Sequence, residues 1–298
     1  MIGSKVLAFG IVFTGLVSNF PAFAGNDKNY DYLALGDSVP FGMDITLLPT
    51  GPGQALPTPS DFTGYPEVVA DIEHWQKSKK FVNAACPGET SGSFLDVNAT
   101  DNGCHSVHLL PVEPYSLPAF KPTIGLHTDY GGSQMNYAVA QLTSNKHIKL
   151  VSLSIGANDF LLLVAICRND QACIGSHYAE VMGKYQTNLT QILAKLRAVY
   201  DGDLVLLTYY APSGEFIPVA NDLNSIAEGV GTAFRAKIAD GFGAFDAVSK
   251  HFDGDACDAG LLIRMPDDSG TCDIHPNLAG QGLLAAAIEA AIHQPKGK

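Results

Sequence analysis

Short apolar runs alternate with longer amphipathic stretches along this chain, and this alternation constrains the fold more than any other feature. The runs are rich in Val, Ile and Leu, and they predict strands over 31–35, 81–85, 148–154 and 203–209, with a weaker fifth near 245–250. Dense runs of this kind suit strands that are covered on both faces. Apolar residues at helical spacing predict helices over about 65–74, 132–144, 178–200, 220–240 and 277–292. The sequence therefore predicts an α/β protein, a three-layer α/β/α sandwich with a central parallel sheet.

The first predicted strand ends in residues that could carry chemistry. Its apolar run, Tyr32–Leu35, stops at Gly36-Asp37-Ser38. This places a serine at the carboxyl end of a strand, where open α/β sheets bind ligands. A hydroxyl is a weak nucleophile at neutral pH, so it needs a base to take its proton and donors to hold an oxyanion. Because the tripeptide alone also suits an ordinary turn, the case for Ser38 depends on partners elsewhere in the chain.

Candidates for these partners occur downstream. The candidate base is His275, in the segment Cys272-Asp273-Ile274-His275-Pro276-Asn277, just before a helical pattern. The candidate oxyanion donors are Gly88, in Cys86-Pro87-Gly88-Glu89-Thr90, and Asn158, in Gly156-Ala157-Asn158-Asp159. Each donor candidate follows an apolar run. A chance occurrence of all four segments, each beside a predicted strand or helix, is much rarer than a chance occurrence of any one of them.

The four segments resemble the conserved blocks of the GDSL, or SGNH, hydrolase superfamily, which is named for a serine, a glycine, an asparagine and a histidine. The matching residues are Ser38, Gly88, Asn158 and His275, and the blocks extend from residue 32 to 277. The resemblance implies the flavodoxin-like SGNH hydrolase fold and a Ser-His-based acyl-enzyme mechanism without a cofactor or metal. It also implies an oxyanion hole formed by the backbone amides of Ser38 and Gly88 and the side chain of Asn158.

The acid member of the site departs from the superfamily pattern. Relatives usually carry an aspartate three residues before the histidine, but here that position is Cys272 and the aspartate is Asp273, two residues before. Two alternatives remain open: Asp273 completes a triad, or a main-chain carbonyl near residues 272–273 orients His275 in a Ser-His dyad.

All six cysteines, at 86, 104, 167, 173, 257 and 272, lie in the part of the chain that would be exported. An even count in an oxidising compartment indicates disulfides, and six cysteines allow fifteen pairings. The chain is similar to secreted actinobacterial esterases and lipases with three disulfides, and this resemblance implies the sequential pairs Cys86–Cys104, Cys167–Cys173 and Cys257–Cys272. Since no Cys-x-x-Cys pair is present, no metal site is expected.

The N-terminus has the features of a secretory signal peptide over residues 1–24. Lys5 precedes an apolar run from Val6 to Val17, and Ala22-Phe23-Ala24 forms a small-x-small cleavage site. The apolar run is shorter than a membrane span needs, and no later run is long enough. We therefore expect a secreted protein without a stable membrane anchor, with one SGNH hydrolase-type esterase domain over residues 25–298.

The net charge of the chain limits the kinds of ligand that it is expected to bind. The whole chain has 18 basic and 30 acidic residues; without Lys5 the balance is 17 against 30, a net charge of −13. An acidic surface disfavours nucleic acid, and a neutral small-molecule or lipid ester is the expected substrate of a monomeric esterase or lipase. The alternatives are a phospholipid acyl hydrolase, a carbohydrate acetylesterase, or a non-catalytic secreted lipid- or glycan-binding protein. The long Pro- and Gly-rich connections 43–64 and 95–130 are expected to wall the active-site cleft.

Overall fold

The computed structural model describes residues 31–51, 53–75, 81–106, 119–267 and 269–293. The proposed signal peptide, residues 1–24, lies outside these ranges. The strands are β1 Tyr32–Gly36, β2 Phe81–Asn83, β3 Leu150–Ser154, β4 Asp203–Leu207, β5 Lys237–Ala239, β6 Leu262–Arg264 and β7 Cys272–Pro276. The helices are α1 Ser38–Phe41, α2 Tyr65–Ile72, α3 Ser91–Leu95, α4 Phe120–Thr123, α5 Gln134–Ser144, α6 Ala157–Ile166, α7 Gln171–Arg197, α8 Ile217–Ala233, α9 Gly241–Ser249 and α10 Leu278–Ile292.

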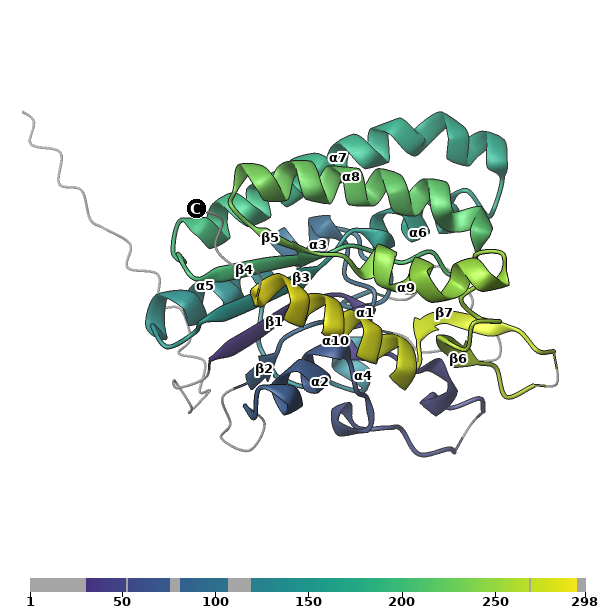
Figure 1. The fold of residues 1–298 in the computed structure, drawn as a ribbon, viewed down its shortest axis with the longest axis horizontal. Helices are drawn as coiled ribbons and strands as arrows, with labels where there is room; N and C mark the ends of the chain where they lie inside the picture. Colours follow the sequence, from purple (N-terminus) through teal and green to yellow (C-terminus); the bar gives the residue numbers. More distant parts are fainter. Residues whose placement is uncertain (1–30, 52, 76–80, 107–118, 268, 294–298) are drawn as a thin grey trace, which may run out of the picture.

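Five of the strands form a parallel sheet in the order β2-β1-β3-β4-β5. Every residue of β1 and β3 is buried, as expected for strands covered on both faces. Helices α7 and α8 pack side by side on one face of the sheet, and α10 packs against α2 and α9 on the other (Figure 1). The predicted three-layer α/β/α sandwich with a central parallel sheet is confirmed.

The fifth strand is not where the sequence suggested. The expected strand near 245–250 is wrong, because residues 245–249 lie in α9, whose first turn is capped by Asp240 and which buries Phe245 against the core. The strand that completes the sheet is β5, three residues long, which lies inside the segment predicted as a helix over 220–240. Helix α8 ends at Ala233.

The carboxyl ends of the parallel strands meet at one edge of the sheet, and this brings the motif segments together. Because β1 lies between β2 and β3, the segments after these three strands are neighbours. These segments contain Ser38, Gly88 and Asn158 respectively. The extended backbone after β2 continues to pair with β1, since the N–H of Cys86 donates to the carbonyl of Gly36 at 3.0 Å.

His275 reaches this edge from outside the parallel sheet. It lies in β7, which pairs antiparallel with β6 in a separate hairpin just before α10. Gln281 of α10 is buried and joins α10 to the nucleophile segment, because its side-chain amide donates to the carbonyl of Val39 and accepts from the N–H of Tyr65. Among the described residues, no helix is both long and apolar enough to span a bilayer.

Candidate active site

Ser38 is held on a tight turn between β1 and α1. At Gly36 the backbone has φ +133°, and a Cβ there would lie 2.0 Å from the carbonyl oxygen of Ser154, so only glycine fits. The carboxylate of Asp37 caps α1 by accepting from the N–H of Val39 at 3.0 Å, and its other oxygen accepts from the hydroxyl of Tyr209. The turn leaves the Ser38 side chain only partly buried, on the wall of a cavity.

His275 and Asp273 form a hydrogen-bonded pair. Since alternate residues of a strand point to the same face, the two-residue spacing on β7 places both side chains on one side. Nδ1 of His275 donates to Oδ2 of Asp273 at 2.5 Å. The hydroxyl of Tyr210 donates to the carbonyl of Ile274 at 2.6 Å and fixes the backbone between them. This geometry favours the triad alternative over a main-chain carbonyl.

The electrostatics of the pair suit a general base. Burial opposes the charged form of His275, but the negative charge and hydrogen bond of Asp273, with smaller contributions from Asp37 and Asp44, raise the pKa of His275 above its usual value. Burial likewise opposes ionisation of Asp273, yet the charge and hydrogen bond of His275 outweigh it and lower the pKa of Asp273. Asp273 therefore stays ionised when the imidazole titrates.

The candidate oxyanion donors are joined by a residue that the sequence did not point to. Asn102 donates from its side-chain amide to Oδ1 of Asn158 at 3.0 Å, and its backbone N–H donates to the carbonyl of Gly88 at 2.8 Å. Because Oδ1 of Asn158 accepts this bond, its Nδ2 is the side-chain group that can donate to an oxyanion. Gly88 has φ +83°, and a Cβ there would lie 2.3 Å from the carbonyl of Asn102. Within the described part of the chain, Nδ2 of Asn158 and the N–H groups of Ser38 and Gly88 make no hydrogen bond.

Two further buried contacts lock these segments against one another. Gln134 bonds both backbone groups of Gly36 and donates to Glu89 at 3.1 Å, so it links the nucleophile strand to the Gly88 loop. Asp159 accepts from the N–H and the hydroxyl of Ser91, at 2.8 and 2.6 Å, and links this loop to α6. Preorganised donors need such support because a small displacement weakens oxyanion binding.

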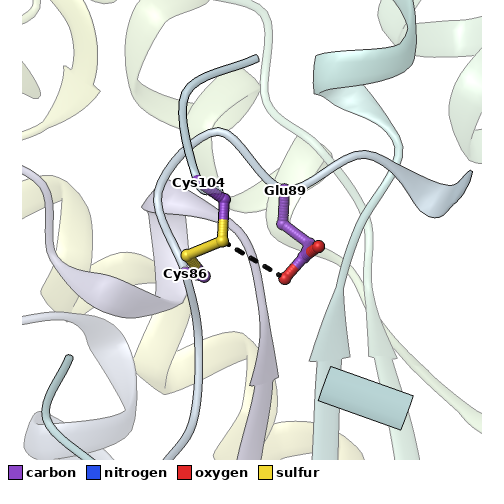
Figure 2. Close-up of side chains that lie close together, drawn as sticks. All are labelled: Cys86, Glu89 and Cys104. Carbon is purple, nitrogen blue, oxygen red and sulfur yellow. Dashed lines mark hydrogen bonds between the residues drawn. A yellow bond between two sulfur atoms is a disulfide. The ribbon is translucent and has the colours of Figure 1, made fainter. Parts of the chain in front are cut away.

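Three disulfides, Cys86–Cys104, Cys167–Cys173 and Cys257–Cys272, are present in the structure, in the sequential pairing that the resemblance implied. Figure 2 shows the Glu89 carboxyl beside the first of them. Oε2 of Glu89 lies 3.6 Å from Sγ of Cys104. Burial raises the pKa of Glu89 to about 8, so its carboxyl is largely uncharged at neutral pH. The cluster of Cys86, Glu89 and Cys104 is not a metal site, because both sulfur atoms are in the disulfide and neither is available as a thiolate.

Ser38, Asn158 and His275 line one cavity of about 80 Å³, while Gly88 is not among its lining residues and contacts Asn102. Most of the rest of the cavity wall comes from α6, from the connection between β4 and α8, and from the start of α8. No lining residue belongs to 43–64, so the expectation that this connection walls the cleft does not hold for this cavity. The described parts of 95–130 do not line it either, but residues 107–118 lie outside the described residues, and for this connection the expectation stays a prediction. Connection 43–64 instead borders a separate groove of about 530 Å³ beyond Gly42 and Pro276.

Comparisons with known proteins agree with this architecture. A model of the GDSL-like lipase/acylhydrolase family matches residues 34–283. No curated protein matches the sequence. A phospholipase A1 from Streptomyces albidoflavus is similar in structure, with 19% identity and a TM-score of 0.53 over 88% of this chain and 99% of that one. An acetylxylan esterase from Geobacillus stearothermophilus has 16% identity and a TM-score of 0.51 over 89% and 95% of the two chains.

At these identities the solved structures show a shared fold, and each named activity is that of the protein concerned. The match to the family model supports a stronger conclusion than the solved structures do, because it spans most of the chain. The matched residues include Ser38, Gly88, Asn158 and His275. This chain belongs to the GDSL-like lipase/acylhydrolase family.

Proposed function

We propose that this protein hydrolyses carboxylic esters through an acyl-enzyme formed on Ser38. The observation that carries the proposal is that His275, which is hydrogen-bonded to Asp273, lines the same cavity as Ser38. Among the described residues, no hydrogen bond joins that hydroxyl to His275. Such contacts are often long in the free enzyme and tighten when substrate binds.

The reaction has two halves. Oγ of Ser38 attacks the ester carbonyl while Nε2 of His275 takes its proton, and Asp273 stabilises the imidazolium that forms. The backbone amides of Ser38 and Gly88 and Nδ2 of Asn158 hold the tetrahedral oxyanion. His275 then returns the proton to the departing alcohol. A water molecule, deprotonated by His275, attacks the acyl-enzyme, and the acid leaves Ser38 with its hydroxyl restored.

The cellular setting of this activity is part of the proposal. The signal-like residues 1–24 and the three disulfides support export to an oxidising compartment, where such bridges persist. Phospholipids and acetylated carbohydrates contain the same ester group, so hydrolysis of their acyl groups is the alternative activity. A purely binding role would leave the free Ser38 hydroxyl and the Asp273–His275 pair without a use.

Ester hydrolysis is tested directly with protein expressed from the full sequence and purified with its disulfides formed. We expect turnover of p-nitrophenyl esters and loss of that turnover after treatment with a fluorophosphonate, a reagent that phosphonylates activated serines. Mass spectrometry of the digested protein should place the single adduct on the peptide that contains Ser38. An adduct on another serine, or no adduct and no turnover in folded protein, would contradict the proposal.

Substitution of Asn158 is predicted to have an intermediate effect on the rate of hydrolysis. We expect Asn158→Ala to lower kcat by about 100-fold to 1000-fold, because it removes one of three oxyanion donors. It also leaves the side-chain amide of Asn102 without its acceptor, at a cost of about 1–3 kcal/mol in the free energy of unfolding. Steady-state kinetics and thermal unfolding measure the two effects. Asn221→Ala, at an exposed position on α8, is the matched control. A near-wild-type rate for Asn158→Ala would remove this residue from the site.

A further inference from the structure

The wall of the cavity beside Ser38 combines reactive and apolar side chains. Ser38, Asn158 and His275 are the reactive residues. The apolar side chains come from α6, from the turn before α8 and from the first two turns of α8: Phe160, Leu161, Phe216, Val219, Ala220 and Leu223. An ester has two arms, the acyl chain and the alcohol, and the chemistry of the wall decides which arm enters.

The polar groups of the wall are already engaged, apart from those that the reaction uses. The hydroxyl of Tyr209 donates to Asp37, and the hydroxyl of Tyr210 donates to the carbonyl of Ile274. A sugar or a charged headgroup would therefore lose its hydrogen bonds to water without replacement in this cavity. An apolar chain loses none and gains the burial of its surface.

A polar alcohol group of an ester could bind in a second space, outside the apolar cavity. The groove beyond Gly42 and Pro276 is lined by charged side chains that include Asp44, Asp61 and Arg264. The groove reaches Gly42, directly after α1, and Pro276, directly after His275, so a charged space and an apolar one both adjoin the segments that carry the reacting serine and histidine. This division assigns the acyl chain to the apolar cavity.

The α8 side of the cavity is fixed in position. Asn224 is buried and bonds both backbone groups of Tyr209, accepting from its N–H at 2.7 Å and donating to its carbonyl at 2.9 Å. Ala220 and Leu223, one turn apart on this anchored helix, are only 4% and 3% exposed. Since the helix is anchored to the end of β4, the size of these two side chains sets the depth of the cavity.

We propose that this cavity is the acyl pocket, that it binds unbranched apolar acyl chains longer than acetyl, and that Ala220 and Leu223 determine the chain length accepted. The proposal rests on the ester hydrolysis proposed above and names its substrate class. Each acyl methylene that becomes buried raises kcat/KM by about fourfold, the equivalent of about 0.8 kcal/mol, until the pocket is full. Fatty acyl esters are thus preferred over acetyl esters.

The test compares kcat/KM on p-nitrophenyl acetate, butyrate, hexanoate and octanoate for the wild type and two variants with opposite effects. We expect Ala220→Phe, which fills the pocket, to lower the octanoate-to-acetate ratio on the order of 100-fold. Leu223→Ala, which deepens the pocket, should move the optimum to longer chains. Ser225→Phe adds the same bulk at an exposed position of α8 and should keep the wild-type ratio.

The outcomes separate this inference from the proposed function. Hydrolysis with an unchanged chain-length profile in both pocket variants would overturn the acyl pocket and leave ester hydrolysis intact. A wild type that prefers acetate over every longer chain would also overturn the pocket. If Ala220→Phe does not fold, the shift in Leu223→Ala decides. No hydrolysis of any ester by folded wild type would overturn both proposals.

Discussion

Ser38→Ala should lower kcat/KM for p-nitrophenyl esters on the order of 10⁵-fold or more while leaving the fold unchanged. The variant retains the backbone amide of residue 38, Asn158 and the His275–Asp273 pair, but it has no atom on which the acyl-enzyme can form. Loss of the nucleophile in a serine hydrolase that works through an acyl-enzyme costs up to about 10⁶-fold in kcat, and only the residual effect of binding and oxyanion stabilisation remains. The measurement is steady-state kinetics with circular dichroism and thermal unfolding on the same samples.

The structure explains why stability should not change. Among the described residues, the Ser38 hydroxyl makes no hydrogen bond, so its removal leaves no buried partner unpaired. We expect the free energy of unfolding to stay within about 0.5 kcal/mol of the wild type. Ser225→Ala, an exposed serine on α8, provides the matched control for both measurements. Activity in Ser38→Ala above one-tenth of the wild-type value would mean that another residue is the nucleophile.

The parts of the fold that could be predicted are those encoded locally. Strands β1, β3 and β4 are dense apolar runs of five residues, and their alternation with amphipathic helices predicts a parallel sheet. Strand β5 has only three residues and directly follows the turn after α8, so the helical pattern before it masked it. The segment 245–250 has Phe, Ala and Val like a strand, but Asp240 caps a helix that begins at Gly241 and runs to Ser249.

The parts of the candidate site that could not be predicted depend on contacts between distant segments. Asn102 supports Asn158 across 56 residues, and Tyr210 supports Ile274 across 64. Neither residue has a local signal, because one is an ordinary asparagine in a long connection and the other follows an apolar strand. The same reason applies to the apolar cavity: the sequence pattern predicts no helix at α6, and it predicts a helix over 220–240 without a role at the site. Composition and spacing carry no information on which helices meet at the end of a sheet.

For the acid member of the site, the spacing in the sequence is misleading on its own. A spacing of three before the histidine suits a turn, but Asp273 and His275 lie on a strand, where a spacing of two brings side chains to one face. The disulfide Cys257–Cys272 ends immediately before Asp273 and restrains the start of this strand. The position that usually carries the acid thus serves the disulfide here, and the neighbouring residue contacts the imidazole.

The second large effect follows from this pair. We expect Asp273→Asn to lower kcat/KM on the order of 10³-fold to 10⁴-fold, because an amide neither stabilises the imidazolium nor holds Nδ1 protonated as a carboxylate does. Asp258→Asn removes one exposed carboxylate next to the same disulfide and should keep wild-type activity. Both variants change the net charge equally, so a loss confined to Asp273→Asn reports the hydrogen bond rather than the overall charge.

The pH profile gives this prediction a second readout. His275 must be neutral to accept a proton, and Asp273 raises its pKa, so wild-type kcat/KM should rise with pH through a midpoint above 6.5. Removing the negative charge lowers the pKa of His275, and the midpoint of Asp273→Asn should move to lower pH. Burial raises the pKa values of Asp37 and Asp159 to about 6, so these groups also titrate in this region. The shift between the two proteins is therefore the diagnostic quantity.

Two results would support the dyad instead of the triad. One is a rate for Asp273→Asn within about tenfold of the wild type, and the other is a midpoint that does not move. In a dyad a main-chain carbonyl would orient the imidazole, and that carbonyl survives the substitution. A large loss with an unmoved midpoint would mean that Asp273 positions β7 without lending charge to His275. Only the combination of a large loss with a lower midpoint makes the carboxylate the partner that raises the basicity of the base.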